Sequence, residues 1–224
     1  MRQIFEGDVH DIVVMENGVC FVFTAEKEQE TAKVEFKMIS FETGKMSRVT
    51  KNVYFLAKFG TRYKTIMQHC SNFAEARVLN LPQDRIFVLD NCDGSAVLLD
   101  SFGLPLWMSQ ISYKGTPPAD IAFVQDSLWA CFKEHNAIIK FNLSNMREEL
   151  RIGGGKNSPF KAPIRLTVTE NGLTVLGAAD KTLVGINLKN YSITEMYTFT
   201  EPVKKYLKAG DFEFVITQSG LYLI

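Results

Sequence analysis

Asp120-Ile-Ala-Phe-Val124 is followed, after one residue, by Asp126-Ser-Leu-Trp-Ala-Cys-Phe132. Both runs are rich in β-branched, aromatic and other apolar residues, and the polar step between them is short. This pattern predicts a β-hairpin. Similar pairs of runs occur at four other places in the chain. Their first runs and turn residues are Asp11-Ile-Val-Val-Met15 with Asn17-Gly18, Ala76-Arg-Val-Leu-Asn80 with Asp84, Ile164-Arg-Leu-Thr-Val168 with Asn171-Gly172, and Val203-Lys-Lys-Tyr-Leu207 with Asp211.

A third β-rich run follows each hairpin, and a fourth follows in four of the five units. The third runs are predicted over 34–41, 95–100, 137–143, 182–188 and 221–224, and the fourth over 44–50, 104–109, 146–152 and 192–199. The turn residues at 17, 84, 126, 171 and 211 are 67, 42, 45 and 40 residues apart. Three of these steps match the period of a β-propeller blade, which has four short antiparallel strands.

We therefore predict a single all-β domain over residues 1–224, a β-propeller of about five four-stranded blades. The blades are expected at about 8–50, 71–110, 117–153, 162–199, and 202–224 together with 1–7. The extra length of the first step lies near 51–70, where a loop, an extended hairpin or a short helix is expected outside the blade pattern. Because the fifth unit ends after its third strand, we expect Arg2–Phe5 to pair with Leu221–Leu223 and complete the last blade, which removes two sheet edges.

The junction between the third and fourth units has a recognisable order. Asn136-Ala-Ile-Ile-Lys-Phe-Asn-Leu143 precedes a glycine loop at Arg151-Ile-Gly-Gly-Gly155, and a Pro-led run and an Asn-Gly turn follow within 158–176. This order resembles the NHL-repeat type of propeller, over about 45 residues closely and over 84–109 less closely. The Asp-x-x-Asn pattern of that family is missing at Gly177-Ala-Ala-Asp180. The resemblance implies a propeller and does not imply a function.

Composition and charge indicate the class of partner. The chain has 25 basic and 25 acidic residues, and nucleic acids and anionic membranes both favour a basic surplus, so neither is predicted as a partner. No apolar run approaches the 18 or so residues of a membrane-spanning helix, and the first residues lack the apolar core of a signal peptide. The four cysteines include no C-x-x-C pair, which favours free thiols in a reducing compartment and a cytoplasmic location.

No motif in the chain specifies a catalytic site or a metal site. The histidines His10, His69 and His135 fall in different units, so no metal ligand set is predicted. There is no G-x-S-x-G nucleophile motif, and the Gly-Lys at Gly155-Lys156 lacks the spacing of a phosphate-binding loop. We therefore predict no catalytic residues, no metal and no cofactor, and we favour a protein that is not an enzyme.

The first strands of the units share a level at which charged residues recur. Counting six residues back from the turn residue reaches a charged side chain in four units, and allowing one extra residue for Pro82 gives the fifth. These residues are Asp11, Arg77, Asp120, Arg165 and Lys205, with His10 directly before Asp11. Charged residues are rare inside strands with two packed faces. We therefore expect the six residues to share a polar environment at the mouth of a propeller channel.

Two functions fit this expectation. In the first, the protein is a binding or scaffold propeller that recognises a protein partner or a small anionic ligand at the channel mouth or the loop face, with arginine and lysine as donors. In the second, it is a propeller hydrolase of the lactonase or glycosidase type, which would need a metal or a separated pair of carboxylates such as Asp11 and Asp120. A structural alternative is that Asp11 and Asp120 neutralise Arg165 and Arg77 and fill the channel. Trp107 and Tyr113 lie near predicted loops and are expected to pack between blades, or else to anchor a partner.

Overall fold

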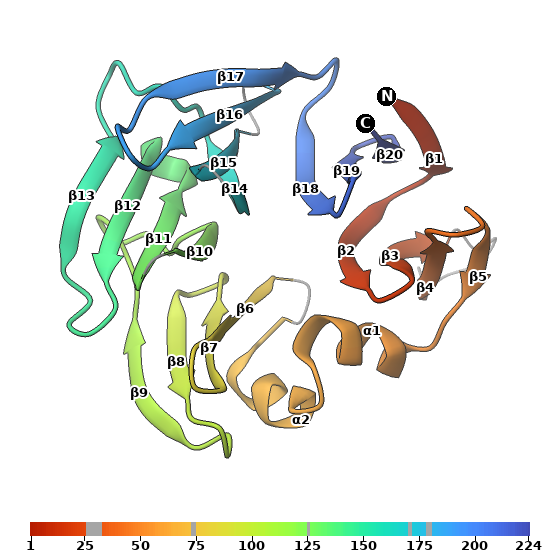
Figure 1. Ribbon diagram of the computed structural model, residues 1–224, viewed down its shortest axis with the longest axis horizontal. Helices are drawn as coiled ribbons and strands as arrows, with labels where there is room; N and C mark the ends of the chain where they lie inside the picture. The colour runs from red at the N-terminus through yellow and green to blue at the C-terminus, as the bar shows by residue number, and fades with distance from the viewer. Residues whose placement is uncertain (26–32, 73–74, 125, 170–171, 178–180) are drawn as a thin grey trace. The chain divides into compact units, whose positions relative to one another are not determined.

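The computed structural model describes residues 1–25, 33–72, 75–124, 126–169, 172–177 and 181–224. These residues group into two compact units, one formed by Met1–Lys64 with Val203–Ile224 and the other by Thr65–Pro202. The strands form five four-stranded antiparallel sheets (Figure 1), two within the first unit and three within the second. The prediction of an all-β chain with five four-stranded blades is confirmed.

Each blade runs through consecutive strands. The first unit contains the blade β2 (Val9–Met15), β3 (Gly18–Ala25), β4 (Lys33–Ser40) and β5 (Met46–Arg48), and the blade β18 (Val203–Ala209), β19 (Phe212–Thr217), β20 (Gly220–Leu223) and β1 (Arg2–Glu6). The second unit contains three blades. They are β6 (Ala76–Leu81), β7 (Arg85–Asp90), β8 (Ser95–Leu99) and β9 (Pro105–Gln110); β10 (Asp120–Val124), β11 (Ser127–Phe132), β12 (Ala137–Asn142) and β13 (Glu148–Gly153); and β14 (Pro163–Thr169), β15 (Gly172–Gly177), β16 (Thr182–Asn187) and β17 (Ile193–Thr198).

The inner strands of the blades are buried on both faces, which explains their nearly continuous apolar sequences. Every residue of β11 is buried, whereas the fourth strands β5 and β9 are largely exposed. A cluster that includes Phe87 and Phe132 joins the first two blades of the second unit, and one that includes Trp129 and Leu166 joins its last two. Apolar packing between neighbouring sheets is thus the main stabilising contribution within this unit.

The N-terminal strand completes the last blade, as predicted. In the register of β1 with β20, Arg2 pairs with Leu223 and Phe5 with Leu221, and Figure 1 shows both ends of the chain at this sheet. The Phe5 ring lies 5.0 Å from the ring of Phe21 and 4.7 Å from that of Phe23, between centroids. β1 is therefore held to β20 by backbone hydrogen bonds, and its Phe5 ring contacts the other blade of the first unit.

The segment after β5 is helical. It contains α1 (Lys51–Phe59), α2 (Tyr63–Ile66) and a 3-10 turn (Met67–His69). α1 packs against β2, β3 and β4 of its own unit (Figure 1) and buries Tyr54, Phe55 and Phe59. Its residues at positions i and i+4 lie on one face of the helix, and this spacing brings two polar side chains to β2, as described below.

Several smaller predictions can be compared with the structure. Cys20 and Cys131 are fully buried free thiols, but Cys92 is exposed, so not every cysteine packs as an apolar residue. The predicted turn residue Asn171 and most of Gly177–Asp180 fall at 171 and 178–180, outside the described residues. In the parts of the chain that the structure describes, no helix has the length and apolar character needed to cross a bilayer.

Candidate functional site

Three of the predicted charged residues meet in the second unit. Arg77 on β6, Asp120 on β10 and Arg165 on β14 come from the first strands of three successive blades. Arg77 Nε lies 3.0 Å from Asp120 Oδ1, and Arg165 Nε lies 3.5 Å from Asp120 Oδ2. The backbone N–H of Leu166 also donates to Asp120 Oδ2, at 2.9 Å. We call Arg77, Asp120 and Arg165 the Asp120 cluster; its carboxylate is fully buried.

A similar arrangement occurs in the first unit. Asp11 on β2 is 3% exposed, and two lysines bind its two oxygens. Lys58 Nζ lies 2.7 Å from Oδ2, and Lys205 Nζ on β18 lies 3.1 Å from Oδ1. The hydroxyl of Tyr54 donates a further hydrogen bond to Oδ2. We call Asp11, Tyr54, Lys58 and Lys205 the Asp11 cluster.

Tyr54 and Lys58 were not predicted as site residues. Both lie on α1, four residues apart, so one helix face brings both side chains to Asp11. The sequence contains this spacing, but it gives no sign that a helix from the insertion packs against β2. The structure also changes the predicted pairing. Arg165 pairs with Asp120, and Asp11 is neutralised by lysines rather than by Arg165.

Three site residues directly follow an irregularity in their strand. The pairing of β2 with β3 skips His10, that of β14 with β15 skips Ile164, and that of β18 with β19 skips Lys204. A bulge of this kind redirects the next side chain and recurs beside functional sites. The residues that follow are Asp11, Arg165 and Lys205. In three blades, a charged residue thus occupies the same position, directly after a bulge in the first strand.

His10 makes different contacts from Asp11. Its Nε2 lies 2.6 Å from Thr24 Oγ1 and 3.8 Å from Asp8 Oδ2. The structure thus brings Asp11 and Lys205 together in one unit, and Arg77, Asp120 and Arg165 together in the other, while His10 contacts residues outside both clusters. The predicted channel mouth would contain residues of both units. That these six residues share one mouth therefore stays a prediction.

The two clusters are similar in charge. Each holds two basic side chains around one carboxylate, a formal surplus of one positive charge. Burial alone raises the pKa of Asp11, but the ammonium groups of Lys58 and Lys205 and the Tyr54 hydroxyl outweigh it and hold this pKa well below its ordinary value. Asp11 is therefore ionised at neutral pH and acts as a fixed negative charge.

Arg165 has unused hydrogen-bonding capacity. Its side chain is 17% exposed, and its one ion-pair contact in the part of the chain that the structure describes is the 3.5 Å approach of Nε to Asp120. Among the described residues, no hydrogen-bond partner is found for its buried Nε. A guanidinium presents five N–H donors in a fixed fork. Arg165 is thus the member of the Asp120 cluster best placed to bind a further acceptor.

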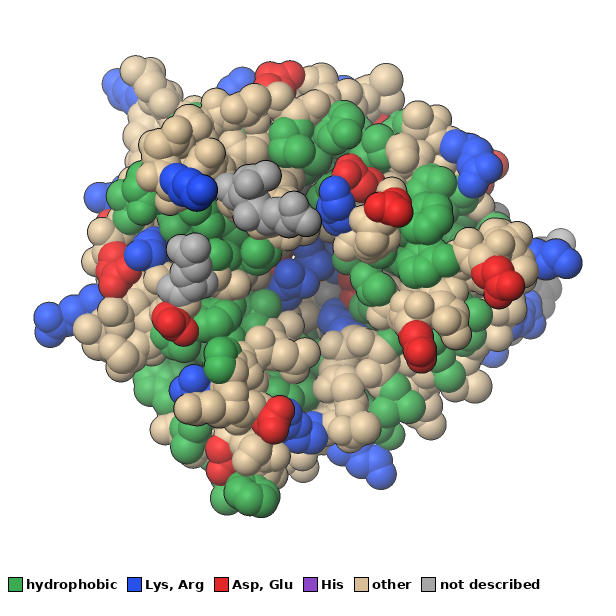
Figure 2. Space-filling view, viewed as in Figure 1, with side chains coloured by type: hydrophobic (Ala, Val, Ile, Leu, Met, Phe, Trp, Pro, Cys, Tyr) green, Lys and Arg blue, Asp and Glu red, His purple; other side chains and the backbone are tan. Residues whose placement is uncertain are grey.

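Figure 2 shows acidic and basic side chains interspersed over the face viewed, in keeping with their equal numbers. Within the described ranges, no three His, Cys, Asp or Glu side chains gather in a way that could hold a metal ion.

We expect Tyr54→Phe to lower the free energy of unfolding by about 1.5–3 kcal/mol, because it removes a hydrogen bond to a buried ionised carboxylate. Urea denaturation measures this change. The matched control is Tyr63→Phe on α2, for which no hydrogen bond of the hydroxyl is found in the described chain and a change within about 0.5 kcal/mol is expected. Equal effects of the two substitutions would show that Tyr54 contributes only its ring.

Comparison with known proteins places this geometry in a fold. No protein-family model matches the chain, and no curated protein matches its sequence. Solved structures do match. Streptogramin B lyase, a β-propeller, is 11% identical with a TM-score of 0.52, over 98% of this chain and 69% of the lyase. The fold is a β-propeller.

Two further solved structures match over the whole of this chain. Virginiamycin B lyase from Staphylococcus aureus is 12% identical with a TM-score of 0.51, over 100% of this chain and 72% of the lyase. Glutaminyl cyclase from Myxococcus xanthus is 9% identical with a TM-score of 0.51, over 100% of this chain and 94% of the cyclase. Identities this low relate the propeller to these enzymes by fold alone.

Proposed function

We propose that this propeller is a binding protein and that the Asp120 cluster holds a small anionic ligand, a carboxylate or a phosphate. The observation that carries the proposal is Arg165, a largely buried guanidinium whose only ion-pair contact among the described residues is a single 3.5 Å approach to Asp120. Arginine is well suited to this role because its fork donates two parallel hydrogen bonds to a carboxylate or phosphate.

Charge and burial support the same proposal. The buried carboxylate of Asp120 faces two guanidinium groups, so the cluster has a formal charge of +1 and one bound negative charge would make it neutral. Charge–charge interactions are stronger in such a partly buried setting than in water. The bulge before Arg165 alters the direction in which its side chain leaves β14.

The hydrolase alternative receives less support. A glycosidase needs one carboxyl group that is protonated at working pH, and enzymes achieve this by raising its pKa. In Asp11 the pKa is lowered instead, by two lysines and a tyrosine hydroxyl that outweigh burial. We further propose that the blades are of the NHL-like type, that the protein is cytoplasmic and that a protein partner binds at the loop face. The ligand experiment below does not depend on these three points.

The test is calorimetric titration of the protein with inorganic phosphate and with citrate, at low ionic strength. We expect binding to the unchanged chain and a loss of at least about tenfold in Arg165→Gln, because charge-assisted hydrogen bonds are lost. The matched control is Arg147→Gln, an exposed arginine of the same unit for which no side-chain contact is found in the described chain. It should bind as the unchanged protein does.

The same variants need a thermal melt. Arg165→Gln should leave the melting temperature nearly unchanged, because Asp120 keeps Arg77 at 3.0 Å and the Leu166 N–H. If Arg165→Gln unfolds the protein at markedly lower temperature while neither anion binds the unchanged chain, the cluster is a structural plug and the proposal is wrong.

A further inference from the structure

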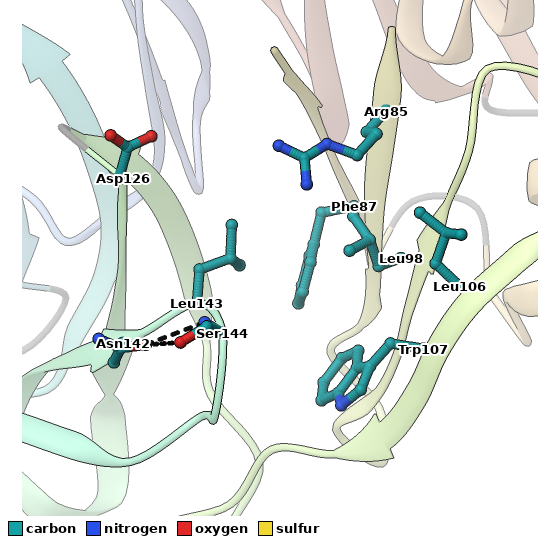
Figure 3. A pocket seen from close by; sticks show the side chains of 9 residues that line it. All are labelled: Arg85, Phe87, Leu98, Leu106, Trp107, Asp126, Asn142, Leu143 and Ser144. Carbon is teal, nitrogen blue, oxygen red and sulfur yellow. Dashed lines mark hydrogen bonds between the residues drawn. The ribbon is translucent and has the colours of Figure 1, made fainter. Parts of the chain in front are cut away.

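A pocket lies in the second unit, and its lining includes none of the residues of the Asp120 cluster. It has a volume of about 570 Å³ and opens between the blade β6–β9 and the blade β10–β13. One wall comes from β7, β8 and β9, and the other from the two turns that follow β10 and β12 (Figure 3). This volume is within the range of small-molecule sites.

One end of the pocket is apolar and aromatic. The indole of Trp107 stacks on the ring of Phe87, with centroids 5.9 Å apart and an interplanar angle of 28°. Leu98 and Leu143 extend the same surface, and Leu106 at the rim is 57% exposed. Trp107 packs against the apolar cluster that joins the two blades, and it also presents an aromatic surface to the pocket, where a further ring could stack in an offset or edge-on arrangement.

The other end carries one charge of each sign. Figure 3 shows Arg85 on one wall and Asp126 on the facing wall, with Trp107 at the opposite end. Arg85 Nε donates to the carbonyl of Pro82 at 3.0 Å, which orients the guanidinium. No ion pair of Arg85 or Asp126 is found within the described part of the chain, so these opposite charges face each other across open space.

The remaining polar side chains of the pocket are engaged. Asn142 Oδ1 accepts from the backbone N–H and the hydroxyl of Ser144, at 2.9 and 2.5 Å, and Asn142 Nδ2 donates to Glu149 at 2.9 Å. The polar side chains of the turn after β12 are thus already hydrogen-bonded within the protein. The groups that can bind a ligand are therefore the guanidinium of Arg85, the carboxylate of Asp126 and the ring of Trp107.

We infer that this pocket binds a small zwitterion that carries an aromatic group, of the class of the aromatic amino acids. Arg85 binds the ligand carboxylate, Asp126 binds its ammonium group, and the ligand ring contacts Trp107. A simple anion would leave Asp126 unpaired, and a simple cation would leave Arg85 unpaired. The inference does not depend on the proposed function, because the two sites share no residue.

The probe for the test is L-phenylalanine, which does not fluoresce in the range of tryptophan. The chain has two tryptophans, and Trp129 is 2% exposed, so a change in emission reports on Trp107. We expect a saturable change with phenylalanine. We expect binding at least about tenfold weaker for 3-phenylpropanoate, which lacks the ammonium group, and for 2-phenylethylamine, which lacks the carboxylate.

Charge-neutral variants then assign each contact. Arg85→Gln and Asp126→Asn should each weaken phenylalanine binding about tenfold. Asp126→Asn should leave 3-phenylpropanoate unaffected, and Arg85→Gln should leave 2-phenylethylamine unaffected. Asparagine also tolerates the left-handed backbone of residue 126, where φ is 61°. The matched controls are Arg147→Gln and Asp211→Asn, the latter at the corresponding hairpin turn after β18; both should bind normally.

Two results would overturn the inference. One is the absence of any saturable phenylalanine signal in the unchanged protein. The other is equal phenylalanine affinity in the unchanged chain, Arg85→Gln and Asp126→Asn. Arg165→Gln separates this site from the Asp120 cluster: it should bind phenylalanine normally, and a loss there would place the ligand at the cluster and contradict the assignment made here.

Discussion

Replacing Asp120 with alanine is expected to lower the free energy of unfolding by about 3–5 kcal/mol, because it removes the buried carboxylate with which the partly buried guanidinium groups of Arg77 and Arg165 form ion pairs. The backbone N–H of Leu166 also loses its acceptor. Chemical denaturation at neutral pH measures the change. The result is expected whether or not the cluster binds a ligand, since it follows from the ion pairs alone.

Two further variants make this result specific. Asp211→Ala removes an exposed aspartate from a hairpin turn and should change stability by no more than about 0.5 kcal/mol. The double variant Asp120→Ala with Arg165→Met should recover part of the loss, because one unpaired charge is removed. A loss below about 1 kcal/mol in Asp120→Ala would mean that the two arginines are well solvated, and the description of a buried cluster would be wrong.

Deleting residues 1–7 should have an effect at least as large, about 3–5 kcal/mol or more. The deletion removes the fourth strand of the last blade and the Phe5 ring that contacts Phe21 and Phe23. It also exposes the backbone of β20 as a raw sheet edge, which promotes association between chains. The melting temperature and the oligomeric state of the shortened chain measure both consequences.

Two point variants distinguish loss of β1 from a general effect of truncation. In Gly220→Ala, the new Cβ would collide with the carbonyl oxygen of Phe5, and the backbone φ of 151° disfavours any side chain. This variant should therefore reproduce part of the destabilisation in the full-length chain. Gln3→Ala removes only an exposed hydrogen bond to Ser219 and should cost about 1 kcal/mol or less. A shortened chain that melts at the original temperature would show that β1 contributes nothing to the fold.

The blade pattern could be predicted because hairpins combine two local signals, strand alternation and turn residues. The count of six residues back from the turn residue stays in step with the pairing of three of these hairpins, because the irregularities at His10, Ile164 and Lys204 lie just beyond the counted segments. The extra residue allowed for Arg77 is also explained. Leu81 pairs with Arg85 across three residues, whereas Val124 pairs with Ser127 across two.

The partners of the charged residues could not be predicted in the same way. Lys58 and Tyr54 reach Asp11 because α1 packs on β2, a tertiary contact that no local pattern encodes. The pocket at Trp107 is a second example. Its charges come from one strand and one turn of different blades, so neither Arg85 nor Asp126 differs in sequence from an ordinary surface residue.

The most direct test of the proposed function is a crystal structure of the protein grown in the presence of inorganic phosphate. The account predicts a phosphate at the Asp120 cluster, with its oxygens about 2.7–2.9 Å from the guanidinium nitrogens of Arg165, the usual length of a charge-assisted bond. Arg77 and Asp120 should keep their ion pair in that structure. A guanidinium of Arg165 that is fully hydrogen-bonded to protein acceptors, with no phosphate beside it, would contradict the account.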